Sequence, residues 1–255
     1  DEGLILVKEE KESLKSEEEK IERILTHILN DVWVWAGVGM NYVTYNQTAS
    51  FLDADYESFK SPSFFLSGGK YFNETLGVEI SYKNSPGEAD NSSNSGGEAT
   101  EYEWKTLSLE ALYKKPLKKK EMLGGYLKGT QSVYRVGIQK HDMPFFNVTS
   151  FLSNTLELSK NEPLMLSLGA SYYMSPYDGV RYELMLRYQY PLTSDIDLDP
   201  IFSFDGLIGA SYSFKKNYFI GAYWYGQYHS FNYTNETYSG SQELFYSNID
   251  IRLGW

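Results

Sequence analysis

The last stretch of the chain, Ile249-Asp250-Ile251-Arg252-Leu253-Gly254-Trp255, decides the fold. Apolar side chains occupy every second position and alternate with charged or small residues. Because successive side chains of a strand point to opposite faces, this period of two predicts a β-strand with one apolar and one polar face. Two environments suit such a strand: the wall of a barrel with lipid outside, and the edge of a soluble β-sandwich.

The same alternation recurs along the chain from residue 31 onward. Its clearest segment is 180–190, where Val, Tyr and Leu alternate with Arg, Glu, Met and Gln. Further alternating segments lie at 76–82, 107–113, 164–174 and 202–214. The longer segments run for about ten residues, which is the length that crosses a bilayer when a strand is tilted. The pattern therefore favours membrane-spanning strands.

Short and long connections alternate between these segments. The short ones are predicted at 72–75, 175–179 and 215–217, and the long ones at 47–60, 84–100 and 231–243. Short turns at one end and long loops at the other are typical of transmembrane β-barrels. Strand directions agree only if 140–163 is one long loop, which predicts ten strands. A strand hidden in 151–160 would require a second and give twelve; eight is the other alternative.

Composition supports a barrel and excludes several other classes. Aromatic residues make up 16% of the chain, with 23 Tyr, 14 Phe and 5 Trp, and barrels place such rings where lipid meets water. The absence of cysteine excludes disulfides, thiol catalysis and cysteine metal sites. A net charge of −11 argues against nucleic-acid binding. The uncharged stretch 32–52 could span a bilayer as a helix, but its amides, glycines and β-branched residues favour strand and loop.

From about residue 31 to residue 255 the chain resembles small bacterial outer-membrane β-barrel proteins as a class. The resemblance rests on the terminal alternation, the tyrosine-rich strands and the asymmetry of the connections. It implies an antiparallel up-and-down barrel in contact with outer-membrane lipid and inserted by the β-barrel assembly machinery. It also implies that this machinery recognises the terminal strand through Ile249, Ile251, Leu253 and Trp255. The class includes anchors, adhesins, narrow channels and enzymes, so it implies no single function.

Residues 1–30 form a different region, rich in Lys and Glu, and are predicted to be an amphipathic α-helix preceding a barrel domain at 31–255. Apolar residues recur at steps of seven and are joined by two neighbours on the same side. The predicted partner-binding face consists of Val7, Leu14, Ile21, Ile24, Leu25 and Ile28. One interpretation is a solvated helix; the other is a helix that binds a periplasmic protein or a second copy of the chain.

The polar faces of the predicted strands gather five acids and four arginines. They are Glu79, Glu110, Arg135, Arg181, Glu183, Arg187, Asp205, Asp250 and Arg252. Charges in a narrow lumen cannot stay unpaired, and side chains can largely fill a barrel of eight to ten strands. We expect a self-paired charge network that plugs the lumen. The alternative is a charged constriction that guides small solutes.

The chain has three histidines, and two of them lie beside polar residues. His141-Asp142 is predicted in a loop and His229-Ser230 at a strand end. Both pairs are superficially similar to the sites of lipid A deacylases and omptin-type proteases, which place His with Ser or Asp near the outer rim. No further motif of either family is present, and single scattered histidines argue against a metal site. The chain is predicted to need no cofactor and not to be an enzyme.

These observations predict an outer-membrane barrel with a structural or interaction role, as an anchor or assembly protein. The N-terminal helix and the C-terminus are predicted on the periplasmic side, with the long loops outside. Expected partners are outer-membrane lipid, the β-barrel assembly machinery, and either a periplasmic protein or another copy, but not nucleic acid. The alternative functions are a narrow channel for solutes or ions and, secondly, a hydrolase at the barrel rim.

Overall fold

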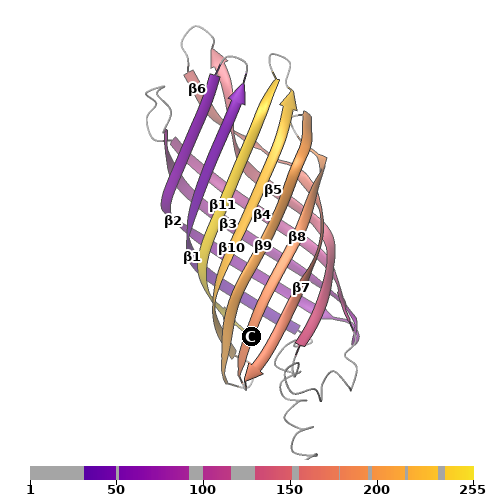
Figure 1. The fold of residues 1–255 in the computed structure, drawn as a ribbon. Coiled ribbons are helices and arrows are strands. Elements are labelled where there is room, and N and C mark those ends of the chain that lie inside the picture. The colour runs from indigo at the N-terminus through magenta and orange to yellow at the C-terminus, as the bar shows by residue number, and fades with distance from the viewer. Residues whose placement is uncertain are drawn as a thin grey trace, which may run out of the picture.

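The computed structural model describes residues 32–49, 52–91, 100–115, 130–150, 155–177, 179–194, 197–215, 218–234 and 239–255. These residues form eleven β-strands (Figure 1). The strands are β1 (Val32–Ala49), β2 (Leu52–Tyr71), β3 (Leu76–Asn91), β4 (Thr100–Lys114), β5 (Thr130–Ser150), β6 (Thr155–Asn161), β7 (Leu164–Tyr177), β8 (Val180–Thr193), β9 (Asp197–Lys215), β10 (Tyr218–Thr234) and β11 (Ser239–Gly254). The helix predicted for residues 1–30 lies outside the described residues.

Ten of these strands close into an antiparallel barrel. The order around the wall is β4-β3-β2-β1-β11-β10-β9-β8-β7-β5, and β5 pairs with β4 to complete the ring. The seam between the first and last strands runs from the pair Trp35–Gly254 to the pair Ala49–Gly240. Closure leaves no strand edge in the ring unpaired, which is what a wall within lipid requires. The prediction of a ten-stranded antiparallel barrel is confirmed.

The strand β6 lies largely within the segment 151–160, and its presence leaves the number of strands in the ring at ten. It pairs only with the far part of β5, from Met143 to Ser150. The rest of β5 pairs with β7, from the pair Lys140–Leu164 to the pair Thr130–Met174. Because β6 and β7 both run antiparallel to β5, together they make one pass along the wall. The expectation that an extra strand would require twelve is therefore wrong, as is the single long loop at 140–163.

We call the two ends of the barrel the turn end and the loop end. The turn end holds the connection Phe72–Thr75, the turn at Gly179, the end of β9, the start of β10 and the C-terminus (Figure 1). Asn73 Oδ1 accepts hydrogen bonds from the backbone N–H groups of Thr75 and Leu76, at 2.9 and 2.8 Å. Gly179 has a φ of 78°, a conformation that glycine adopts without steric cost.

At the loop end the strands are longer than predicted, so the connections are shorter. The predicted loop 47–60 is largely strand, since β1 runs to Ala49 and β2 begins at Leu52. Likewise, β3 continues to Asn91 and β10 to Thr234. These extensions are polar, so hydrophobic alternation does not mark them, yet their backbones pair in the same ladders. Strand pairing therefore extends beyond the apolar band.

The outer surface of the wall carries the apolar side chains. Ile249, Ile251 and Leu253 are each more than half exposed, and Trp255 is 49% exposed on the same side. In a soluble β-sandwich Leu184, Leu186 and Ile208 would form the core, but all three are more than half exposed. A band of exposed apolar side chains around the wall requires lipid, which excludes the soluble alternative. Among the described residues, no helix is both long and apolar enough to cross a membrane.

Candidate functional site: the charged lumen

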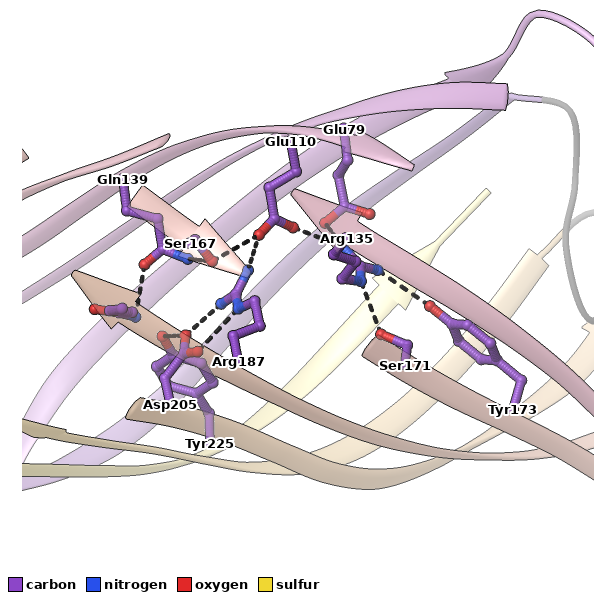
Figure 2. Close-up of polar contacts among 11 residues, drawn as sticks. Glu79, Glu110, Arg135, Gln139, Ser167, Ser171, Tyr173, Arg187, Asp205 and Tyr225 are labelled. Carbon is purple, nitrogen blue, oxygen red and sulfur yellow. Dashed lines mark hydrogen bonds and ion pairs between the residues drawn. The ribbon is translucent and has the colours of Figure 1, made fainter. Parts of the chain in front are cut away.

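All nine charged residues singled out on the polar faces point into the barrel. The structure brings them together in three groups along the lumen. A central network contains Glu79, Glu110, Arg135, Arg187 and Asp205, drawn in Figure 2. Asp250 and Arg252 form a second group on β11, and Arg181 and Glu183 form a third on β8.

Arg187 on β8 is the centre of the network. Its Nη1 donates to Glu110 Oε1 at 2.6 Å, and its Nε donates to Asp205 Oδ1 at 2.9 Å. Its Nη2 pairs with Asp205 Oδ2, so the guanidinium holds Asp205 in a two-pronged contact. Glu110 lies on β4, three positions around the ring from β8. The side chain therefore crosses the lumen and joins distant parts of the wall (Figure 2).

Arg135 on β5 occupies the other side of Glu110. Its Nη1 lies 2.8 Å from Glu110 Oε2 and 3.2 Å from Glu79 Oε1. The remaining nitrogens donate to Ser171 Oγ at 2.8 Å and to Tyr173 OH at 3.2 Å. Each ionised group here has a partner of opposite charge, which offsets the desolvation cost of burying it.

Small residues on neighbouring strands make room for these long side chains. A Cβ atom at Gly169 would lie 2.6 Å from Arg187 Cγ, and one at Gly137 would lie 2.7 Å from Glu110 Cα. Gly169 is paired with Arg187, and Gly137 with Glu110. Glycine therefore lets Arg187 and Glu110 lie flat against the wall before they extend into the lumen.

The second group links β11 to β2. Arg252 donates to both carboxylate oxygens of Asp250, at 2.6 and 3.0 Å, and Asn248 Nδ2 donates to Asp250 Oδ2 at 2.8 Å. The Arg252 guanidinium also lies over the rings of Phe65 and Tyr223, at 3.9 and 4.4 Å from their centroids. Ring faces attract a cation, so Arg252 is held by a carboxylate and by two rings.

The third group is looser. Arg181 Nη2 lies 3.9 Å from Glu183 Oε2, and its guanidinium is surrounded by Trp35, Tyr173 and Phe219 at 5.2 to 5.8 Å. The side chains of Arg181 and Glu183 keep 12% and 13% exposure. Those of Glu110 and Asp205 keep 1% and 0%. Solvent therefore reaches the third group and Glu79 at the edge of the central network, but not Glu110 or Asp205.

Lys83 is a luminal cation that the sequence analysis missed. It lies on β3 and is buried, with its Nζ 3.3 Å from the centroid of the Tyr225 ring. The predicted alternating segment ended at residue 82, and one more step of the period would have placed Lys83 on the inner face. Lys83 brings the number of luminal cations named above to five, equal to the number of acids.

Rings and sulfur-containing side chains fill the loop-end half of the lumen. Trp104 on β4 and His229 on β10 lie on opposite strands of the ten-membered ring, yet their ring centroids are only 6.0 Å apart. Gln242 on β11 donates to the backbone oxygen of Pro144 on the opposite strand β5, at 3.2 Å. Trp104, Met143, Met165 and Leu244 belong to the same buried cluster. Among the described residues, side chains from opposite walls therefore meet in this half.

The two histidines beside polar residues come together, but not as predicted. His141 lies on β5 rather than in a loop, because β5 continues to Ser150. Its ring is 5.3 Å from that of His229, and Thr106 Oγ1 lies 3.1 Å from His141 Nδ1. Neither ring nitrogen of His229 has a hydrogen-bond partner among the described residues. This pair thus forms no His–Asp or His–Ser arrangement that would activate a nucleophile.

Among the described residues, no three or more His, Cys, Asp or Glu side chains form a group that could hold a metal ion. The nine charges are instead satisfied by one another and by Ser, Tyr and Asn groups. At the loop end the ion pairs are exposed: Lys140 Nζ lies 2.6 Å from Glu162 Oε2. The Lys140 ammonium lowers the pKa of the Glu162 carboxyl by hydrogen bonding and by its charge.

The turn-end half contains a cavity. Its empty space is about 1040 Å³, including the part that opens to solvent. The rings of Trp33, Trp35, Tyr71 and Phe219 line it together with charged side chains of all three groups. Trp255 also lines it, so the cavity reaches the end of the barrel where the chain terminates.

Solved structures share this architecture. The outer membrane protease OmpT from Escherichia coli aligns with a TM-score of 0.55 at 7% identity, over 89% of this chain and 96% of that one. The fold is that of the small bacterial outer-membrane β-barrel proteins. An outer membrane channel from Pseudomonas putida F1 aligns with a TM-score of 0.46 at 11% identity, over 89% of this chain and 97% of that one. Neisserial surface protein A aligns with a TM-score of 0.33 at 11% identity, over 88% of this chain and 96% of that one.

Sequence comparison adds no family to this result. No protein-family model matches the chain, and no curated protein matches it in sequence. The TM-score of 0.55 shows a common fold, whereas an identity of 7% transfers no activity, so the function has to be argued from the lumen.

Proposed function

We propose that the protein is a closed barrel of the bacterial outer membrane with an anchoring or interaction role, and that it conducts neither ions nor solutes. In this proposal the turn end faces the periplasm and the extended strands of the loop end face outward. The support for the location is the lipid-facing apolar surface and the arrangement of short and long connections.

The single observation that carries the closed state is the contact between opposite walls. Trp104 and His229 meet across the full width of the loop-end half, and the central network spans the lumen below them. An ion crossing the barrel would have to separate buried rings and then break the Arg187 ion pairs. Both steps cost far more than thermal energy, since breaking a buried ion pair costs about 3–5 kcal/mol.

Recording from planar lipid bilayers tests this proposal. We expect folded wild-type protein to give no current steps. The triple variant Trp104→Gly, His229→Ala, Arg187→Ala removes the contact across the loop-end half together with the centre of the network, and it provides a control that the assay can detect an opened barrel. Discrete wild-type steps that change with Arg187→Met or Glu183→Gln would instead establish the narrow channel.

We also propose that the N-terminal segment docks a periplasmic partner or a second copy of the chain. This rests on the apolar column of residues 7, 14, 21 and 28 in the sequence. In the full chain, Leu14→Asp with Ile21→Asp should abolish association measured by sedimentation in detergent or by crosslinking in cells. Ser16→Asp, off the column, is the matched control. Equal association in all three proteins would contradict the docking role.

A further inference from the structure

The cavity of the turn-end half has an unusual wall for the interior of an acidic protein. Five cationic side chains and only two carboxylates line it, although the chain carries a net charge of −11. The two carboxylates are Glu79 and Glu183. Those of Glu110, Asp205 and Asp250 do not contribute to the lining, because they lie behind the arginines that they bind. The surface offered to a ligand is therefore positive.

Lys83 is the cation with the least compensation in this wall. It is 5% exposed, and its Nζ has no hydrogen bond and no carboxylate within ion-pair distance among the described residues. Two ring faces lie near its Nζ, those of Tyr225 and Tyr246, with their centroids at 3.3 and 5.2 Å. A buried ammonium without an anion is costly, and a ring face offsets only part of that cost. An anionic group in the cavity would supply the missing partner.

Arg252 lies close to Lys83 and shares its surroundings. Phe65 is directly paired with Lys83 across β2 and β3, and the Arg252 guanidinium lies 3.9 Å above the Phe65 ring. Tyr223, which Arg252 also contacts, accepts a hydrogen bond from Arg181 Nη2 at 3.4 Å. The three cations thus surround one region, and rings separate them.

Aromatic side chains form much of the remaining wall. Trp33, Trp35, Tyr71 and Phe219 line the cavity between the cations and the turn end. Flat apolar side chains bind the apolar part of a ligand, and a few convergent charges orient it, which is the usual composition of a small-molecule site.

We propose that the turn-end cavity binds a small organic anion, a carboxylate or phosphate ester with an aromatic or acyl body. The anionic group contacts Lys83, with Arg252 and Arg181 beside it, and the apolar body lies against Trp33, Trp35 and Phe219. The ligand enters at the turn end, because the loop-end half is closed. This site is independent of the proposed anchoring role, since it requires no current and no partner protein.

Titration calorimetry of the full-length protein in detergent tests the site, with phenylbutyrate as the probe and protein-free micelles as the blank. We expect saturable binding that Lys83→Met weakens about 10-fold, the effect of losing one charge-assisted contact. Methionine keeps an unbranched side chain that is one atom shorter, and it removes the charged ammonium group. The matched control is Lys105→Met, which removes a loop-end cation paired with Glu103 at 2.5 Å and should leave binding unchanged.

A second variant keeps the test decisive if Lys83→Met does not fold. Ser81 lines the cavity on the same strand and face as Lys83. Ser81→Glu introduces a carboxylate that competes with the ligand for Lys83, so it should also weaken phenylbutyrate binding.

Three outcomes would overturn the proposal. They are the absence of saturable binding, equal affinity in wild type and Lys83→Met, and inorganic phosphate binding as tightly as phenylbutyrate. The last result would identify a plain anion site without a role for the rings. Phenylbutanol, the neutral analogue, should bind at least about 10-fold more weakly than the acid, because it lacks the charge that Lys83 attracts.

Discussion

The two halves of the lumen share the same ten strands and differ in what fills them. In the loop-end half, large side chains such as Trp104 and Met143 reach the opposite wall and exclude water. In the turn-end half, cations and rings surround empty space. The alternation of a strand decides which side chains point inward, but their size at each level decides whether that level is closed.

The central network separates these halves, so its removal should have the largest effect. We expect Arg187→Met to lower the free energy of unfolding by about 3–5 kcal/mol, because it leaves Glu110 and Asp205 buried without their shared partner. Urea unfolding in lipid or detergent, followed by tryptophan fluorescence, measures the change. Lys105→Met, which removes a half-buried cation at the loop end, should cost less than about 1 kcal/mol.

A charge-neutral version sharpens this result. Adding Asp205→Asn and Glu110→Gln to Arg187→Met removes the two orphaned carboxylates. The triple variant should therefore recover part of the lost stability, as expected when uncompensated charge causes the loss. A triple variant that is less stable than Arg187→Met would show that shape, rather than charge, makes the network important.

The same truncation in each half compares their packing directly. Trp104 is fully buried, and its ring centroid lies 5.2 Å from that of Tyr246, whereas Trp35 borders the cavity. We expect Trp104→Ala to cost about 3–5 kcal/mol, because it leaves a void in a closed layer. Trp35→Ala should cost less, since its space joins an existing cavity. Equal losses in urea unfolding would contradict the distinction between a packed and an open half.

A single added methyl group probes how closely Arg187 lies against the wall. Gly169→Ala places a Cβ 2.2 Å from the Leu186 backbone oxygen and 2.6 Å from Arg187 Cγ, and it should destabilise the barrel by about 1–3 kcal/mol. Gly206 is the matched control, because a Cβ there would meet nothing closer than a backbone oxygen at 3.3 Å. Gly206→Ala should be near neutral. If both variants unfold at the same urea concentration, the wall has more freedom than the structure shows.

Local alternation was enough to predict the inward direction of Arg187 and Asp205. Each occupies the polar face of a strand whose other face is apolar, and period two assigns the side. Their partner Glu110 could not be assigned, because it lies three strands away around the ring. The contact depends on register and closure, which no local pattern contains.

The loop-end half was harder to predict for a different physical reason. Its inward side chains include Val43, Trp104 and Leu244, so both faces of these strands are partly apolar and the alternation is blurred. Beyond the lipid band, nothing requires apolar side chains outside, and polar runs such as 84–91 pair as strands while resembling loops in sequence. The meeting of His141 and His229 follows from that missed pairing.

Trp255 should have the smallest effect on the folded barrel and its main effect in the cell. Its backbone exchanges two hydrogen bonds with Val34, at 2.8 and 2.9 Å, and an Ala at position 255 would keep both. The ring is 49% exposed, so Trp255→Ala should change urea unfolding in detergent by less than about 1 kcal/mol. If the assembly machinery recognises the terminal ring, the same variant should lower the amount of protein in the outer membrane several-fold. Trp224→Ala, another exposed tryptophan on the outer surface, is the control and should leave that amount closer to normal. Wild-type levels of Trp255→Ala would show that the terminal aromatic is dispensable for insertion.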